Sequence, residues 1–367
     1  MFSHIHPDNY EQQLSDKEQE MTALFSCFEL PSAEIFSSKP LNYRLRAEFR
    51  VWHQGDDLYY IMFNSETKEK FRVDDFPVAS KLINQAMKAL LVLIKDIKAL
   101  RYKLFQVDFL STLSGELLIS MLYHKPLEPT WENAAKVLKD ELSSIAPVDI
   151  IGRAKKQKII IDKDYVMESL HVGDSTFVYQ QVENSFTQPN GGVNEEMLFW
   201  AQQATINAGG DLIELYCGNG NFSIALAQNF DRVLGTEISK TSVKSAQINI
   251  KANNIDNINI VRMSSEEFSL AMNGERKFRR LADFDLTAYN YDTVLVDPPR
   301  AGLDNDSIEL VSRFNKVIYI SCNPETLKEN LTELTKTHVI EKFALFDQFP
   351  YTAHIETGVV LTRKVNV

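Results

Sequence analysis

The sequence predicts an α/β protein of two domains, with an α+β domain over residues 1–180 and a doubly wound, mainly parallel sheet over residues 181–367. Length and composition favour this division, because 367 residues with 44% apolar side chains bury a large core more comfortably in two domains. After residue 180, short apolar strands alternate regularly with helical segments. Alternation of this kind is typical of a sheet whose ligands bind beyond the carboxyl ends of the strands.

The first half combines helical and two-residue periods. Residues 1–37 have heptad-like apolar spacing and predict a helix, in which we expect Cys27 to be a small buried core residue. From Leu41 apolar side chains alternate with charged ones, which predicts an antiparallel hairpin with one basic face and a turn at residues 53–57. Further helices are predicted over 79–100 and 131–144, and further strands over 104–110, 116–122, 148–152 and 158–161. We therefore expect an α+β domain with an antiparallel sheet.

The second half contains seven short apolar runs that predict strands. They cover residues 211–215, 232–237, 257–263, 293–297, 316–321, 341–347 and 358–363. The last two are close enough in sequence to pair as a hairpin, so the final strand is expected to run antiparallel to its neighbours. It would then begin at the edge where the parallel strands end, and Glu356 would lie at that edge.

Composition excludes several classes of protein. Three cysteines are too few and too scattered for a disulfide framework, a four-thiolate zinc site or an iron–sulfur cluster. The net charge of -11 argues against indiscriminate nucleic-acid binding, so RNA would need a local basic patch. The segment RAKKQK at 153–158 is a candidate for such a patch, and a solvated charged loop is the alternative interpretation. The N-terminus resembles no secretory leader, and the apolar run at 89–94 is cut off by Lys95. We expect a soluble cytoplasmic protein.

A glycine turn marks the predicted ligand site. Residues 211–222, DLIELYCGNGNF, read as a strand that ends in a turn with Gly218 and Gly220 before a helix. A dinucleotide site would have a third glycine or an alanine where this chain has Ser223, so an NAD site is disfavoured. Glu237 ends the next strand, where a carboxylate can accept bonds from both ribose hydroxyls; a surface glutamate is the alternative.

Two more strands end in polar motifs at the same predicted edge, DPPR at 297–300 and SCNP at 321–324. The proline after Asp297 holds the aspartate extended and presents its carboxylate to the pocket. Cys322 stands beside helix-starting amides. A free thiol is only about a tenth ionised at neutral pH, so the site must favour the thiolate or deprotonate it when substrate binds. A buried structural thiol, the alternative, leaves the position of Cys322 at the ligand edge unexplained.

A lone cysteine at this edge suits covalent catalysis on a pyrimidine. C5 of uracil is a poor nucleophile, but a thiolate that adds to C6 turns the ring into an enolate with a nucleophilic C5. After a methyl group is transferred, a base near C5 must remove the proton so that the cysteine can leave. Glu356 and His354 are both candidates for this base, and spacing alone does not choose between them.

These motifs together resemble the RNA uracil-C5 methyltransferase family. The matching segments are FTQPN at 186–190, ELYCGNGNFS at 214–223, TEI at 236–238, DPPR at 297–300, SCNP at 321–324 and FPYTAHIETGVVL at 349–361. In the first half they are YRLRAEFRVWH at 43–53 and LFQVDFLSTLSG at 104–115. Each motif alone is modest evidence, and the combination is highly specific.

The resemblance implies a Rossmann-like S-adenosylmethionine-dependent methyltransferase domain after an N-terminal RNA-binding domain. It implies that Cys322 is the nucleophile and Glu356, not His354, the proton acceptor. The residues implied to line the S-adenosylmethionine and uracil pocket are Gln188, Tyr216, Asn221, Glu237 and Asp297. No metal, membrane or obligate protein partner is expected.

The resemblance also implies the substrate. Ribosomal-RNA members typically add an oligonucleotide-binding domain and a four-cysteine iron–sulfur cluster, and this chain lacks the cysteines for the cluster. It therefore resembles the branch that methylates uridine 54 in the tRNA T-loop, and T-loop-like RNA such as tmRNA is a further expected substrate. That uridine must be flipped out of its stack, and Phe105 and Trp52 are candidates to take its place, although both are more often core residues.

Three other functions fit parts of the sequence. Amino-group methylation of adenine or cytosine also uses a proline pair, but an aromatic residue normally follows it where this chain has Arg300, and that chemistry does not need Cys322. Ribosomal RNA is an alternative substrate. A role in RNA binding or folding is expected to accompany catalysis rather than replace it, because the cysteine and the glutamate are both present.

Overall fold

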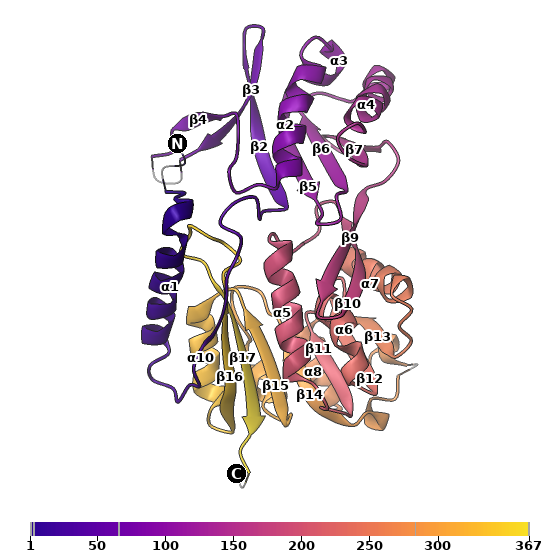
Figure 1. Cartoon of the computed structure of the whole chain (residues 1–367). Coiled ribbons are helices and arrows are strands. Elements are labelled where there is room, and N and C mark those ends of the chain that lie inside the picture. The colour runs from indigo at the N-terminus through magenta and orange to yellow at the C-terminus, as the bar shows by residue number, and fades with distance from the viewer. Residues whose placement is uncertain (1, 3, 65–66, 283, 366–367) are drawn as a thin grey trace. The chain divides into compact units, whose positions relative to one another are not determined.

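The computed structural model describes residue 2 and residues 4–64, 67–282 and 284–365, and it divides into two compact units (Figure 1). Unit 1 comprises Met1–Pro7, Lys39–Ser169 and Gln180–Gly191, and unit 2 comprises Asp8–Ser38, Leu170–Tyr179 and Gly192–Val367. The predicted domains, 1–180 and 181–367, divide the chain differently, because residues 8–38 and 170–179 belong to unit 2 and residues 181–191 belong to unit 1. The two-stranded sheet of β9 (Tyr165–Val172) and β10 (Ser175–Val182) contributes residues to both units.

Unit 1 contains a seven-stranded sheet in the order β4-β3-β2-β5-β6-β7-β8. Its strands are β2 (Arg46–Gln54), β3 (Asp57–Phe63), β4 (Lys70–Val73), β5 (Leu104–Ser111), β6 (Leu117–Tyr123), β7 (Val148–Ala154) and β8 (Gln157–Ile160). Its helices are α2 (Lys81–Ile94), α3 (Lys98–Arg101) and α4 (Pro129–Leu142). Most neighbours pair antiparallel, as expected, but β6 and β7 are parallel because α4 connects them as a crossover.

One face of this sheet is the core of unit 1. Ala47, Phe49 and Val51 of β2 point into it and are buried together with side chains of α2 and α4. The alternating residues Glu48 and Arg50 are exposed, which confirms the predicted two-residue period. The other face of β2 is therefore polar and basic.

Unit 2 contains an eight-stranded sheet in the order β1-β16-β17-β15-β14-β11-β12-β13. Its strands are β1 (Glu34–Phe36), β11 (Asp211–Leu215), β12 (Arg232–Glu237), β13 (Ile258–Arg262), β14 (Tyr291–Val296), β15 (Lys316–Ser321), β16 (His338–Phe346) and β17 (Glu356–Arg363). Neighbours pair parallel except that β17 runs antiparallel to both β15 and β16. The predicted mainly parallel sheet is thus confirmed.

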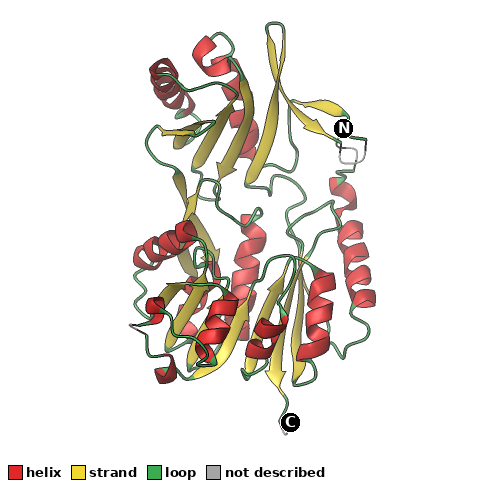
Figure 2. Cartoon of the chain, turned by 180° about the vertical axis from the view of Figure 1, so that it is seen from behind, coloured by secondary structure: helices red, strands yellow, loops and turns green. Residues whose placement is uncertain are grey.

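Helices cover both faces of this sheet (Figure 2). They are α1 (Tyr10–Leu24), α5 (Gly191–Ala204), α6 (Asn221–Leu226), α7 (Lys240–Ala252), α8 (Ser265–Met272), α9 (Asn305–Val311) and α10 (Pro324–Leu334). Short 3-10 turns cover Pro7–Asn9, Ala227–Asn229, Arg279–Leu281 and Leu286–Ala288. Side chains of α1, α8, α9 and α10 share one buried cluster, and those of α5 and α6 share the other. Two apolar layers sandwich the strands, which explains their continuous apolar runs.

The N-terminal segment corrects two predictions. The helix expected over residues 1–37 ends at Leu24, and β1 follows and pairs parallel with β16. Pro31 favours this break, because proline cannot continue a helix and pushes the residue before it to extended backbone. Cys27 is exposed rather than buried, since it follows the end of the helix.

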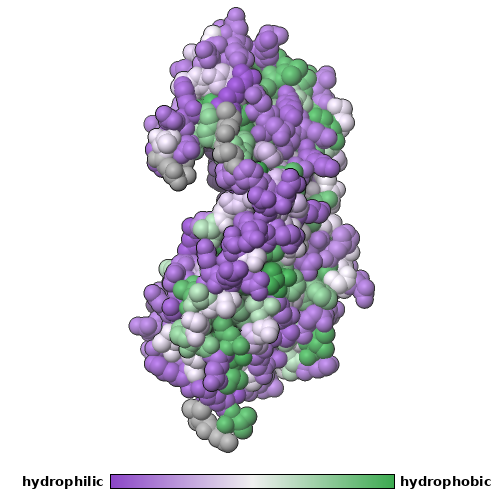
Figure 3. Space-filling view, turned by 60° about the vertical axis from the view of Figure 1, so that its left-hand side comes forward, coloured by the Kyte–Doolittle hydropathy of each residue, from purple (hydrophilic) through white to green (hydrophobic). Residues whose placement is uncertain are grey.

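No helix in the described part of the chain is long and apolar enough to cross a membrane. The face of the molecule drawn in Figure 3 is largely hydrophilic, with hydrophobic residues in scattered patches.

Candidate active site

The sheet topology of unit 2 brings four strand ends to one edge. Parallel pairing aligns Leu215 of β11 with Thr236 of β12 and with Val296 of β14, and β15 continues in the same direction. The antiparallel β17 begins where β15 ends, with Thr357 opposite Ser321. The predicted hairpin is confirmed, and Cys322 and Glu356 therefore emerge at the same edge.

The turn after β11 adopts backbone conformations that favour glycine. Gly218 and Gly220 have φ of +56° and +85°, and Tyr216 itself is left-handed at +64°. The Tyr216 hydroxyl lies 2.6 Å from the Ser265 hydroxyl oxygen, which ties the turn to α8. A Cβ atom added at Gly218 would meet no heavy atom within 4 Å, so space stays open beside the turn.

Glu237 is held by the backbone on both sides of its carboxylate. One oxygen accepts a hydrogen bond of 3.0 Å from Gly218 N–H, and the other accepts one of 2.6 Å from Ser239 N–H. Each carboxylate oxygen has a further lone pair. The carboxylate can therefore accept hydroxyl donors from a ligand without releasing the turn.

Asn221 opens α6 and forms a reciprocal amide pair with the buried Asn194 of α5, with N···O distances of 2.9 and 3.1 Å. Its backbone carbonyl also accepts a 3.0 Å bond from the Tyr179 hydroxyl. Gln188 belongs to unit 1, where the carbonyl of the next residue, Pro189, accepts a 2.7 Å bond from Leu45 N–H. Of the predicted pocket residues, Tyr216, Asn221, Glu237 and Asp297 are thus in unit 2 and Gln188 is not.

The loops after β14 and β15 are bonded to each other. The Asn323 side-chain amide donates to the carbonyl of Arg300 over 2.9 Å, and the Thr326 hydroxyl donates to the same carbonyl over 3.3 Å. The Asn323 side-chain oxygen also caps α10 by accepting from Glu325 N–H. These bonds fix the segment that follows Asp297 against the segment that contains Cys322.

Cys322 is half-buried, and its surroundings disfavour the thiolate. Burial, followed by the negative charges of Glu356 and Asp297, raises the pKa of Cys322 to about 11, while Arg300 acts in the opposite direction. Burial, together with the charges of the two carboxylates, therefore favours the protonated thiol in the resting site. The other possibility remains, that Cys322 loses its proton when substrate binds.

Glu356 is buried, with 6% of its surface exposed, and holds a proton more tightly than an ordinary glutamate. Burial and then the charge of Asp297 raise the pKa of Glu356 to about 8, and Arg300 lowers it. Removal from water also raises the pKa of Asp297 to about 7. His354, by contrast, is exposed. Burial and electrostatic coupling to Cys322 favour Glu356 over His354 as the base near the thiol.

The chain is similar to known methyltransferases along almost its whole length. A family model described as tRNA (Uracil-5-)-methyltransferase matches residues 9–364. This chain belongs to the tRNA (uracil-5-)-methyltransferase family. The tRNA/tmRNA (uracil-C(5))-methyltransferase of Colwellia psychrerythraea is 81% identical over 99% of this chain and 100% of the relative. The enzyme of the same name from Vibrio parahaemolyticus is 59% identical over 98% of both chains.

A solved structure supports the family fold. The crystal structure of Pyrococcus abyssi tRNA (uracil-54, C5)-methyltransferase in complex with S-adenosyl-L-homocysteine superposes with a TM-score of 0.72 at 21% identity. The superposition covers 96% of this chain and 84% of the Pyrococcus abyssi chain. The predicted Rossmann-like methyltransferase fold is confirmed.

The family motifs contain a buried carboxyl that sequence reasoning missed. Burial raises the pKa of Glu214, the penultimate residue of β11, to about 8, with Asp297 and Glu237 adding to the effect. The Ser223 hydroxyl donates a hydrogen bond to it. A glutamate inside the apolar run DLIEL was the available signal, because buried charged groups are rare unless they have a role.

Arg300 is a second residue whose part in the site sequence reasoning missed. It is exposed, and it is the cation that lowers the pKa of both Cys322 and Glu356. The DPPR motif indicated where Arg300 lies. It did not indicate that the charge of Arg300 acts on the Cys322 thiol. Among the described residues, no group of three or more His, Cys, Asp or Glu side chains could hold a metal ion.

Proposed function

We propose that this chain methylates C5 of uridine 54 in the T-loop of tRNA, in the cytoplasm, with S-adenosylmethionine as methyl donor and with T-loop-like tmRNA as a further substrate. The observation that supports this most directly is a half-buried thiol, Cys322, at the same sheet edge as a buried carboxyl, Glu356. The high-identity relatives are named for the same reaction on tRNA and tmRNA.

In the proposed reaction the Cys322 thiol loses its proton and the sulfur bonds to C6 of the uracil, which makes C5 nucleophilic. C5 would then take the methyl group that the bound donor supplies, as the bond between that methyl carbon and the sulfonium sulfur breaks and S-adenosylhomocysteine is left. Ionised Glu356 removes the C5 proton, the C5=C6 double bond re-forms, and the C6–S electron pair returns to the sulfur. Because the pKa of Cys322 is raised to about 11, the thiol proton must be lost as substrate binds.

The turn after β11 and the end of β12 fit the donor. S-adenosylmethionine supplies a sulfonium-bound methyl group when bound. Glu237 would hold its ribose hydroxyls, since both carboxylate oxygens keep an acceptor position beside the open Gly218 turn. By their position in the family motifs, Tyr216 and Asn221 are proposed to line the same pocket, and Gln188 is proposed as a further donor-binding residue. Asp297 would face the donor and the uracil.

Unit 1 offers groups suited to RNA. The Phe105 and His124 rings stack at 4.1 Å, and the Arg50 guanidinium lies 4.5 Å from the Phe105 ring centre. Trp52 is partly exposed under the ammonium of Lys70 at 3.3 Å. Both aromatic groups have cations beside them, as in stacking sites for unpaired bases. We propose that this surface contacts the T-arm.

The basic loop at 153–158 is only partly available for phosphate. Arg153 and Lys158 form ion pairs with Glu183 at 2.5 and 3.3 Å. Lys155 and Lys156 are exposed at the turn between β7 and β8. We therefore propose Lys155 and Lys156 as the phosphate contacts of this loop.

The proposed function is tested with an unmodified tRNA transcript, the protein and S-adenosylmethionine, followed by mass spectrometry of nuclease fragments. The expected result is one new 5-methyluridine in the T-loop fragment, and none in a matched transcript with cytidine at position 54. Methylation of ribosomal RNA and not of tRNA would show that the substrate is wrong.

Replacing Glu237 with alanine is expected to weaken binding of S-adenosylhomocysteine by about 10- to 100-fold, because two charge-assisted bonds to ribose hydroxyls are lost. Isothermal titration calorimetry measures the change in Kd. Glu266→Ala, at an exposed position of α8, is the matched control and should bind as wild type does. If Glu237→Ala binds S-adenosylhomocysteine with an unchanged Kd, Glu237 does not hold the ribose.

Turnover is expected to rise with pH, roughly fivefold between pH 7 and pH 8, because only ionised Glu356 can accept the C5 proton. The raised pKa of Glu356, about 8, keeps it protonated at lower pH. Asp297, with a pKa of about 7, titrates with it, so the midpoint belongs to the pair. The rate of adduct breakdown in single-turnover reactions from pH 6 to 9 measures this.

Arg300 supplies the control for this pH profile. Arg300→Met removes the cation that lowers the pKa of Glu356, so the midpoint should move to higher pH. Arg313→Met, which removes an exposed arginine paired with Glu309, should leave the midpoint in place. If the midpoint of the pH profile does not change in Arg300→Met, a group other than Glu356 controls the pH dependence.

A further inference from the structure

Helix α1 reaches the loop that precedes Glu356 through one buried lysine. Lys17 is 5% exposed, and its ammonium forms an ion pair of 2.6 Å with Asp347, which is fully buried. The two residues are separated by 330 positions in the sequence. Asp347 directly follows β16, and the loop then leads to β17 and Glu356.

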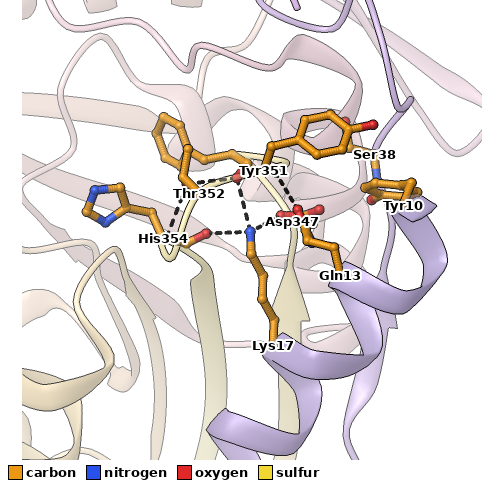
Figure 4. Close-up of polar contacts among 9 residues, drawn as sticks. Tyr10, Gln13, Lys17, Ser38, Asp347, Tyr351, Thr352 and His354 are labelled. Carbon is orange, nitrogen blue, oxygen red and sulfur yellow. Dashed lines mark hydrogen bonds and ion pairs between the residues drawn. The ribbon is translucent and has the colours of Figure 1, made fainter. Parts of the chain in front are cut away.

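Lys17 also bonds to both ends of this loop. Its ammonium donates to the carbonyl of Phe349 over 3.0 Å and to the carbonyl of His354 over 2.9 Å (Figure 4). With the bond to Asp347, all three donors of the ammonium are used. Two of the three acceptors are backbone atoms, so Lys17 fixes the course of the chain as well as balancing a charge.

The tip of the loop is held by the same face of α1. Gln13, one helical turn before Lys17, accepts a hydrogen bond from the backbone N–H of Tyr351. Tyr351 has φ of +63°, a left-handed conformation that disfavours a residue with a side chain. Its ring also packs edge-on against Tyr10 with centroids 6.2 Å apart. The helix thus contacts the loop at its start, its tip and its end.

The end of the loop determines where Glu356 points. His354 lies two residues before Glu356, and the intervening Ile355 is buried in the core. Because peptide groups are planar, a fixed carbonyl at His354 and a buried side chain at Ile355 leave little freedom for the backbone of Glu356. A catalytic group displaced by about 1 Å loses roughly a hundredfold in rate.

We infer that Lys17 of α1 is a positioning residue for the reaction, which holds the loop of residues 347–355 so that the Glu356 carboxylate can take the C5 proton. This inference rests on the proposed function in that it assigns Glu356 as the base. Lys17 itself is not proposed to touch RNA or donor. Its effect is therefore confined to the last step, in which the C5 proton leaves and the C6–S bond breaks.

The obvious variant, Lys17→Met, also leaves Asp347 as a buried unpaired charge, which destabilises the fold whatever the role of Lys17. The double variant Lys17→Met/Asp347→Leu removes that charge. Apolar replacement of a buried ion pair is often neutral for stability or even stabilising. The double variant leaves the carbonyls of Phe349 and His354 without the Lys17 ammonium. Its effect on turnover therefore reports loop positioning separately from the stability of the fold. Lys342→Met, which removes the exposed ion pair with Glu34, is the matched control.

Both variants, the control and wild type are compared with unmodified tRNA transcript and methyl-labelled S-adenosylmethionine. We expect turnover to fall about a hundredfold in Lys17→Met and to stay low in the double variant although its melting temperature recovers. The Kd for S-adenosylhomocysteine should not change, and the KM for S-adenosylmethionine should fall together with turnover, because the slowed step follows methyl transfer. A protein–RNA adduct that contains the labelled methyl group should accumulate on denaturing gels, because methyl transfer precedes the slowed step.

Two outcomes of the activity assay would overturn the inference. Turnover that recovers together with melting temperature in the double variant would make Lys17 a purely stabilising residue. A folded variant that forms no methylated adduct would place its effect before proton removal. Hydrogen exchange of the backbone amides of residue 349 and residues 351–355 gives a readout independent of activity. It should be faster in the double variant and unchanged in Lys342→Met. If wild type itself methylates no RNA, the proposed function fails. Hydrogen exchange then still tests the loop, because unchanged exchange in the double variant would show that Lys17 does not anchor it.

Discussion

Replacing Cys322 with alanine is expected to abolish 5-methyluridine formation, with a loss of at least about 10⁴-fold in turnover. Without the sulfur at C6, C5 of the uracil stays too weak a nucleophile to take the methyl group. Mass spectrometry of the T-loop fragment measures the product, and denaturing gels should show no protein–RNA adduct. The variant should still bind S-adenosylhomocysteine, because Glu237 and the glycine turn are unchanged.

Cys27→Ala is the matched control for this experiment. Cys27 is an exposed free thiol in the same unit, so its loss should leave turnover and adduct formation as in wild type. Methylation that persists in Cys322→Ala would overturn the covalent mechanism. Methylation lost in both variants would instead point to a general effect of cysteine replacement.

Replacing Glu356 with glutamine is expected to lower turnover by about 10²- to 10⁴-fold while the methylated adduct accumulates. The amide has nearly the shape of the carboxyl but cannot take the C5 proton, so the C6–S bond cannot break. The adduct is measured by denaturing gel electrophoresis with labelled methyl donor, and its formation rate should change far less than its decay.

Glu341→Gln is the matched control for Glu356, since Glu341 is an exposed glutamate in the neighbouring strand β16. It should turn over like wild type. If Glu356→Gln formed no adduct, the carboxyl would act earlier, for example in deprotonating Cys322, whose pKa it raises. If the adduct decayed at the normal rate, another base would remove the proton.

Local patterns in the sequence predicted much of the fold. The strands β11, β12 and β15 have the predicted bounds, because each is a short apolar run buried on both sides. The glycines at 218 and 220 adopt the positive φ that their turn requires. The end of α1 at Leu24 was missed, since the apolar spacing of the following residues continues while the backbone does not.

The candidate site also has features that the sequence predicted and features that it did not. Its motifs were visible because Asp297-Pro and Cys322-Asn-Pro stand directly after strands, and their placement at one edge followed from parallel topology. The electrostatics were not visible. Burial and the carboxylates of Glu356 and Asp297 decide that the thiol is protonated at rest, and no local pattern encodes that sum.

The sequence by itself determined the family, the strand and helix types of most segments, and the residue types that meet at the ligand edge, since these depend on neighbours along the chain. Only the tertiary structure decided that Lys17 bonds to the loop before Glu356, that Cys27 is exposed and that Glu214 is a buried acid. Those properties depend on burial and on contacts between residues hundreds of positions apart, such as Lys17 and Asp347, and such contacts arise from packing and not from periodicity.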